Sequence, residues 1–415
     1  MKELLSFEQA PPFHVPLRFL LSAIPFGIAA GVLLMFSGDS LASRWTPTAL
    51  ALTHLMTVGL MLQAMCGALL QITPVAIGAN VPAPTLLASV VHPCLLLGAI
   101  CLVAAFLGAG EVFYFLGAIG LASGLLPFGL VALWALWRAP VRNPSRKALI
   151  VAVTGLLVTA VFGVALAVAR GGGTVSPALV STAAHFRMGW MVWGLALLSG
   201  ASYLVVPMFQ LTPQFPAPFQ KFFVAGLAAA GLLVLWSPGH PAVDACLATL
   251  AASYAVVTLR LQRARRRPRV DSSFRFWQLA LVSTCAAACL SLALPWLPDP
   301  SRAEVLLGLL VMVGGFDSVI CGMMYKIVPF LTWLHLNNAG AKPLLMHHVI
   351  EESAMRIHLR LHAAALPPLL LTPWVPEMSV LAGALLAAAH IRQAHNMAIA
   401  LGRYRERRKE LVALP

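Results

Sequence analysis

Three histidines lie in or beside long apolar segments, where an ionisable side chain is costly and is therefore a candidate for function. His54 and His185 stand near the start of two such segments, and His240 follows the end of a third in Trp236-Ser-Pro-Gly-His240. Neutral imidazole is a good ligand for haem iron and for copper. A single histidine of this kind is more often a hydrogen-bonding residue, but the three together predict a metal or haem site.

Three further polar residues have two interpretations each. His92, which precedes Pro93, is either another ligand or a hydrogen-bonding residue within a helix bundle. Arg187 either pairs with a propionate group of haem or extends to the lipid headgroups. Asp317 is either a proton-relay carboxyl or a structural one satisfied by Ser318 and the backbone, and we favour the structural role.

A second group of histidines falls toward the expected cytoplasmic side of the chain. His358 and His362 are four residues apart and so share one face of a helix. Because arginines and glutamates flank them, we expect an amphipathic lead-in to that helix rather than a metal site. The remaining histidines of this group are His335, His347, His348, His390 and His395.

Composition and charge indicate a membrane protein. Of the 415 residues 60% are hydrophobic and only 10% are charged, against about 25% charged in an ordinary soluble domain. Apolar segments of roughly 20 residues, the length that crosses a bilayer core, recur along the whole chain. The net charge of +14 comes from short basic loops, which indicates membrane topology rather than a nucleic-acid partner. We therefore expect one polytopic domain, 1–415, in contact with membrane lipid.

The seven cysteines give no sign of a disulfide framework or a zinc motif. They lie inside apolar segments and lack zinc-type spacing, so we expect them to be buried as small hydrophobic residues. Their positions are 66, 94, 101, 246, 285, 289 and 321.

The apolar segments predict twelve membrane spans. Basic residues gather after the fourth span, the eighth span and the last span, and positive loops are retained in the cytoplasm. Both termini are thus expected in the cytoplasm of a bacterial cell, with the chain in the inner membrane and without a cleavable signal peptide. The expected spans are 17–37, 48–76, 84–107, 111–137, 147–169, 179–210, 219–238, 241–261, 275–296, 303–333, 354–374 and 377–402.

One pattern occurs three times and orders the spans. Each copy closes a long apolar run with Gly, a bulky residue at the fourth place and Pro at the eighth, and the copies are Gly67–Pro74, Gly200–Pro207 and Gly322–Pro329. They fall on the second, sixth and tenth expected spans. This placement favours three equivalent blocks of four spans, near 1–145, 146–270 and 271–415.

The repeat also measures depth in the membrane. His54 precedes the proline of its copy by 20 residues, and His185 precedes the proline of the next copy by 22. We therefore expect both histidines at nearly the same level near the outer surface. His240, at the outer end of the seventh span, is expected at that level too.

The repeat and the histidines resemble the catalytic subunit I of the haem–copper oxidase superfamily, in particular its C-type oxidases and nitric oxide reductases. In that family span 6 opens with a copper-ligand histidine and ends in Gly-x-x-Tyr-x-x-x-Pro, which His185 and Gly200–Pro207 resemble. His54 matches the haem ligand of span 2 in position, and the segment ending at His240 resembles a reduced form of the copper motif of span 7. The resemblance implies haem b, with copper as a further candidate cofactor.

The chain also departs from that family. Span 10 of the family carries a His-x-His pair, where this chain has Leu306-Leu-Gly-Leu-Leu-Val-Met312. Span 7 has one histidine instead of two, so oxygen reduction coupled to proton pumping is not expected. His54-Leu-Met-Thr-Val-Gly59 is similar to the His-x-x-Thr-Val-Gly segment of NnrS-type haem- and copper-containing membrane proteins linked to nitric oxide stress, although their His-x-His-Glu motif is absent here.

The sequence and these resemblances together predict an all-α protein of twelve transmembrane helices, similar to oxidase subunit I, that binds haem and serves respiratory or nitric oxide chemistry with a redox partner or respiratory subunit. His54, His92 and Arg187 are the expected haem contacts. His185 and His240 are the expected metal ligands. The alternative is a cofactor-free transporter, or an assembly factor for respiratory complexes, on the same scaffold. Whether the protein is an enzyme stays open.

Overall fold

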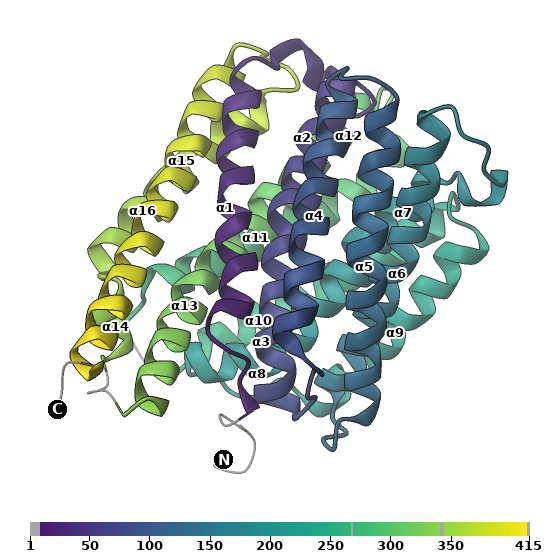
Figure 1. Ribbon diagram of the computed structural model, residues 1–415. Helices are drawn as coiled ribbons and strands as arrows, with labels where there is room; N and C mark the ends of the chain where they lie inside the picture. The colour runs from purple at the N-terminus through teal and green to yellow at the C-terminus, as the bar shows by residue number, and fades with distance from the viewer. Residues whose placement is uncertain (1–8, 267–268, 341–343, 413–415) are drawn as a thin grey trace.

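The computed structural model describes residues 9–266, 269–340 and 344–412, which form a bundle of helices without a β-strand (Figure 1). Ten helical segments of this described part are long and apolar enough to cross a membrane. The chain is thus a multi-pass membrane protein. The ten segments are His14–Met35, Pro47–Ile77, Pro84–Phe106, Val112–Arg138, Pro144–Arg170, Pro177–Gln210, Ala217–Trp236, Pro241–Arg263, Ser272–Trp296 and Ser301–Asn338.

These ten segments match the first ten expected spans to within a few residues. The unbroken helices among them are α1 (His14–Met35), α4 (Pro84–Phe106), α5 (Val112–Arg138), α6 (Pro144–Arg170), α9 (Ala217–Trp236) and α10 (Pro241–Arg263). The ninth segment consists of α11 (Ser272–Ala293) and the short η6 (Leu294–Trp296).

The count of twelve spans is not reproduced by length and composition. The last two long helices, α15 (Glu352–Leu371) and α16 (Met378–Val412), contain histidine, glutamine and arginine and fall outside the ten. They nevertheless lie along the bundle: α16 packs against both α1 and α15 (Figure 1). Their connection also reaches the loop after α1, because a Cβ on Gly38 would lie 2.8 Å from the carbonyl oxygen of Pro376.

The three spans with the repeated motif share an irregularity. Each changes from α-helix to π-helix and back, and each π-helix ends 13, 12 and 12 residues before the repeat proline of its span. π-Helical turns are rare and occur frequently at functional sites. The segments are α2 (Pro47–His54), η3 (Leu55–Met61) and α3 (Leu62–Ile77); α7 (Thr182–Arg187), η5 (Met188–Leu195) and α8 (Ala196–Gln210); and α12 (Ser301–Leu309), η7 (Leu310–Asp317) and α13 (Ser318–Asn338).

The repeated glycine is a point of close helix contact. In each copy, an added Cβ would come within 3.2 Å of the carbonyl oxygen of a residue near the start of the preceding helix and within 3.0 Å of the Cβ of the residue three positions later. Small residues at such interfaces let membrane helices approach closely. The contacts join Gly67 to Pro16 and Phe19, Gly200 to Ser145 and Ala148, and Gly322 to Ser273 and Phe276.

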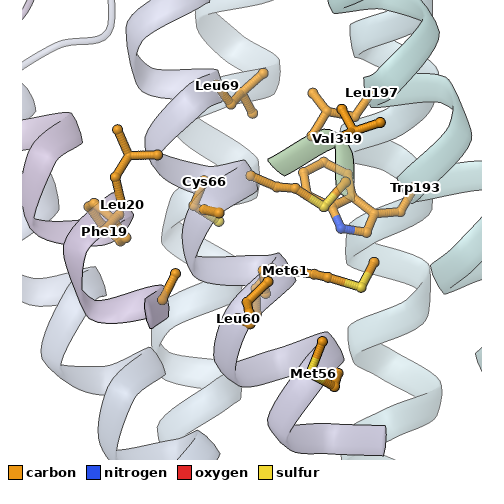
Figure 2. Packing of buried hydrophobic residues seen from close by; sticks show 14 of the residues in the cluster. Phe19, Leu20, Met56, Leu60, Met61, Cys66, Leu69, Trp193, Leu197 and Val319 are labelled. Atoms are coloured by element: carbon orange, nitrogen blue, oxygen red, sulfur yellow. The ribbon is translucent and has the colours of Figure 1, made fainter. Parts of the chain in front are cut away.

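The helix pairings recur in the same way around the bundle. The repeat-bearing helices α3, α8 and α13 pack on α1, α6 and α11, respectively. At the centre α3 contacts both α8 and α13, and η3 contacts η7. Figure 2 shows this apolar core, in which Met61 of η3, Trp193 of η5 and Val319 of α13 point toward one another. These pairings favour the three-block arrangement, which stays a prediction.

The described ends of the chain meet on one side of the bundle. Phe13 stacks on Tyr404 with ring centroids 4.1 Å apart, and His335 Nε2 lies 3.1 Å from the carbonyl oxygen of Pro11. The start of α2, which leads to His54, lies at the opposite end (Figure 1). His54 therefore lies at the end of the bundle remote from both described ends.

Candidate functional site

A cavity of about 580 Å³ opens among the helices at the end that contains α2 and α7. His54 and His185 both line it, and so do Leu307 and Gly308, which occupy the equivalent place in the third repeat. His54 and His185 thus share one cavity, and their depth in the membrane stays a prediction. Ligand sites are commonly concave pockets of about 300–1,000 Å³ that are mostly apolar with a few polar groups.

The two histidine rings that line the cavity are close to each other and nearly parallel. Their centroids are 6.5 Å apart, and their planes are 12° from parallel. A metal–imidazole bond is about 2 Å long, and the ring centre lies about 1 Å behind the nitrogen, so two histidines on opposite sides of one ion have ring centres about 6 Å apart. The centroid distance of His54 and His185, 6.5 Å, is close to this value.

Backbone carbonyls fix the orientation and the tautomer of both rings. His54 Nδ1 lies 2.7 Å from the carbonyl oxygen of Leu50, and His185 Nδ1 lies 3.1 Å from that of Thr159. A carbonyl only accepts, so each Nδ1 carries the proton and each Nε2 keeps its lone pair. Neither Nε2 has a hydrogen-bond partner in the described chain. Anchoring one ring nitrogen in this way is typical of metal-ligating histidine.

Arginines surround the outer part of the cavity. Arg187 donates two hydrogen bonds of 2.7 Å to the carboxylate of Asp244, so it is held by a partner rather than extended to headgroups. Arg44 pairs with Glu304 at 2.9 Å, and burial lowers the pKa of its guanidinium while the Glu304 carboxylate opposes that change. Arg170 also lines the cavity, with its guanidinium 5.6 Å from the ring centre of Phe106.

Arg170 differs from the other two arginines in its charge balance. It forms no ion pair with a residue that the structure describes, whereas Arg187 and Arg44 each have a carboxylate partner. Among these three, Arg170 is thus the cation with spare capacity for an anionic group in the cavity.

The structure does not bring His240 or His92 to this pair. His240 is exposed at the start of α10, where its Nδ1 accepts a hydrogen bond of 3.1 Å from the backbone N–H of Ala242 and caps the helix. His92 is half-buried and bonds Ser22 Oγ at 2.9 Å, with Phe19 against its edge. This is the hydrogen-bonding interpretation of His92. The expected third ligand fails because the turn before α10 directs His240 away from the cavity lining.

A second group of polar residues is fully buried among α13, α15 and α16. Asp317, Cys321, His358, His362 and His390 are all 0% exposed. Potential ligand atoms of Cys321, His358 and His362 lie within 4.8 Å of one another, and so do those of Asp317, Cys321 and His390. The group has the donors to bind a metal ion, and none of its members lines the large cavity.

Helical spacing assembles this buried cluster. Asp317 and Cys321 are four residues apart at the junction of η7 and α13, and His358 and His362 are four apart on α15. Residues at that spacing lie on one helix face. Metal sites in helix bundles are built in this way, from inward side chains on facing helices.

The cluster corrects two expectations from the sequence. His358 and His362 are not part of a solvated amphipathic face, because both are completely buried. Asp317 is not satisfied by Ser318, whose hydroxyl instead contacts the carbonyl oxygen of Val313 and His362 Nε2. The i, i+4 spacings are visible in the sequence. The packing of the tenth span, which contains η7 and α13, against α15 and α16 is not.

No protein-family model matches this chain, and no curated protein is similar enough to it to be counted as a relative.

Proposed function

We propose that this protein is a b-type haem-binding membrane protein in which His54 and His185 are the two axial ligands. The observation that supports it best is the ring pair itself: centroids 6.5 Å apart, with both Nδ1 atoms anchored on carbonyls, beside a cavity of about 580 Å³. The site fits a copper ion without haem less well, because His54 and His185 would be its only histidine ligands and His240 lies elsewhere.

The arginines that line the cavity, Arg44, Arg170 and Arg187, agree with this proposal. Haem carries two anionic propionates, and a cofactor in an otherwise apolar pocket needs a cationic partner for them. Arg170 is the candidate for this contact, since Arg187 is already paired with Asp244. Phe106, whose ring centroid lies 4.8 Å from that of His54, provides an apolar wall beside the ligand.

Two histidine ligands favour electron transfer over gas reduction. Haem supplies one-electron chemistry, and its axial ligands and pocket decide between ligand binding and electron transfer. With His54 and His185 both bound to the iron, no coordination position would stay open for oxygen or nitric oxide. We infer a role in respiratory or nitric oxide chemistry as an electron carrier, with a redox partner in the inner membrane.

The absorption spectrum of the purified full-length protein tests this assignment. We expect a Soret band, and sharp α and β bands after reduction, in protein from haem-replete cells. His54→Ala and His185→Ala should each remove the low-spin spectrum. His92→Ala and His240→Ala are the matched controls and should leave it unchanged, because neither histidine lines the cavity.

A wild-type protein that lacks a Soret band would remove the haem proposal. The cavity would then favour the alternative, a transporter or an assembly factor without a cofactor. Equal loss of the spectrum in His54→Ala and His92→Ala would reject the assignment of the ligands.

A further inference from the structure

We propose that the buried cluster of Asp317, Cys321, His358, His362 and His390 is a second metal centre, which holds one transition-metal ion independently of haem. Cys321 belongs to both sets of donors that lie within 4.8 Å of one another, so it is the ligand around which the ion is placed. The proposal does not rest on the cavity of His54 and His185, which shares none of these residues.

The unpartnered atoms of the cluster indicate where an ion belongs. His358 Nε2, His362 Nδ1, His390 Nε2 and Asp317 Oδ2 are all buried and have no hydrogen-bond partner among the described residues. His390 Nε2 lies 3.3 Å and His362 Nδ1 lies 3.9 Å from the same oxygen, Asp317 Oδ2. Buried polar atoms are almost always satisfied, so such a concentration of exceptions requires an explanation.

The hydrogen bonds on the far side of two of the rings place lone pairs on their inner nitrogens when the rings are neutral. Ser318 donates to the carbonyl oxygen of Val313, so it accepts from His362 Nε2–H and leaves Nδ1 unprotonated. His390 Nδ1 donates to Gln393 Oε1 at 3.1 Å, so in the neutral ring its Nε2 is the nitrogen with the lone pair. Two nitrogen lone pairs then face the same carboxylate oxygen, and a cation would stabilise that arrangement.

A metal ion fits this arrangement better than a proton. One proton can bridge a single nitrogen–oxygen pair, whereas two imidazoles face the same carboxylate oxygen. Cys321 Sγ lies 3.3 Å from Asp317 Oδ1, which places a soft donor in the same group. The outer nitrogens are held by hydroxyl or amide groups, as the outer nitrogens of metal-binding histidines usually are. Tyr325 is one of them, 2.8 Å from His358 Nδ1.

The donor types select the class of metal. Thiolate favours zinc and copper(I), and imidazole favours zinc, copper, iron and nickel, so thiolate with imidazole indicates an ion of the zinc class. Binding replaces the S–H bond of Cys321 with a metal–sulfur bond, and the proton is released to the buffer. The site is closed on every side by helices, which is typical of a structural centre or a site with a slow exchange of its ion.

Cobalt and zinc titrations of the full-length protein test the proposal. Protein without a histidine tag is stripped with a chelator and titrated with Co²⁺. We expect thiolate-to-cobalt charge-transfer absorption that saturates at one Co²⁺ per chain and disappears when Zn²⁺ is added. Cys321→Ser should abolish this band. His358→Gln, His362→Gln and His390→Gln should each weaken binding at least tenfold.

Two matched variants separate a metal role from a packing role. Cys66→Ser alters an equally buried thiol in the apolar core of Figure 2 and should keep the cobalt band. Tyr325→Phe keeps every ligand but removes the hydroxyl beside His358, and it should weaken binding about 10–100-fold. The proposal is overturned if wild-type protein gives no charge-transfer band, or if Cys321→Ser keeps the band.

The same titration distinguishes this site from the haem site. His54→Ala should keep the cobalt band, and Cys321→Ser should keep any Soret band. Loss of cobalt binding in His54→Ala would overturn the independence of the two sites.

Discussion

At the scale of single residues, the geometry of the proposed haem ligands His54 and His185 depends on a glycine. A Cβ on Gly163 of α6 would lie only 2.8 Å from Cε1 of His185. The ring cannot simply turn aside, because its Nδ1 is held by the carbonyl oxygen of Thr159, one turn earlier on the same helix. Gly163 thus gives His185 the room to stand opposite His54.

Gly163→Ala should therefore lower haem occupancy without removing a ligand. We expect at least a tenfold weaker retention of haem, or conversion of the low-spin spectrum to a high-spin one, because His185 must move off the axis of His54. Spectra and haem content of the purified variant measure this effect. Gly402→Ala is the control, since a Cβ there would meet no atom within 4 Å. Unchanged spectra in Gly163→Ala would count against His185 as a ligand.

The sequence predicted single residues unevenly. The repeat prolines placed His54 and His185 at one depth, and the structure joins them in one cavity. His240 shared their expected level, but whether a residue in a turn faces inward depends on a few backbone angles that a spacing does not determine. Cys321 was counted as a small hydrophobic residue because its partners come from helices distant in sequence.

At the scale of helices, the repeated glycine is a packing device rather than a catalytic motif. Each copy brings a repeat-bearing helix close to the first residues of the helix before it. In a membrane such contacts supply much of the association, because lipid is as apolar as the helix surface. This explains why the motif recurs although its three spans carry different polar residues.

Substitution of one repeat glycine tests this interpretation. Gly200→Ala would place a Cβ 2.9 Å from the Cβ of Ala148, so we expect destabilisation by about 1–3 kcal/mol. The midpoint of thermal unfolding in detergent measures the change. Gly231→Ala on α9 is the control, because its nearest neighbour, a methyl of Val192, would be 3.4 Å away. The control should be neutral or stabilising, since alanine favours a helix by about 1 kcal/mol over glycine. Equal stability of both variants would contradict the packing role.

The π-helices are the part of the helix architecture that periodicity did not foresee. A π turn inserts an extra residue into an otherwise regular helix, and its sequence is as apolar as its surroundings. Asp317 ends η7, so this irregularity helps determine which helix face its carboxyl shares with Cys321. The expected span agrees with the structure. A constant period of about 3.6 residues per turn, however, does not predict which residues share a helix face on the two sides of the π-helix.

At the scale of the whole molecule, the helix contacts form a closed ring that includes α16, which in turn packs against α15. The last helix of one predicted block packs on the first helix of the next predicted block in the pairs α5 with α6 and α10 with α11. The pair α16 with α1 closes the ring in the same way. The polar residues that lower the apolarity of α15 and α16 include His358, His362 and His390, which face the interior instead of lipid.

Accessibility of single cysteines decides between ten and twelve spans. Glu377 is exposed between α15 and α16, near the loop after α1, and Ser176 is exposed beyond the end of α6. In a Cys289→Ser background, a membrane-impermeant maleimide should label both Ser176→Cys and Glu377→Cys in intact cells whose outer membrane is permeable. Arg142→Cys, in a basic loop, should be labelled only after the inner membrane is opened.

The three positions separate the topology from its orientation. Labelling of Arg142→Cys alone in intact cells would reverse the predicted orientation of the protein. Labelling of Ser176→Cys without Glu377→Cys would leave ten spans and place α15 and α16 outside the set of crossing helices. The complete burial of the cluster's polar side chains would then need a different explanation. Labelling of both supports twelve crossings, because a polar interior is tolerated in a membrane helix when neighbouring helices surround it.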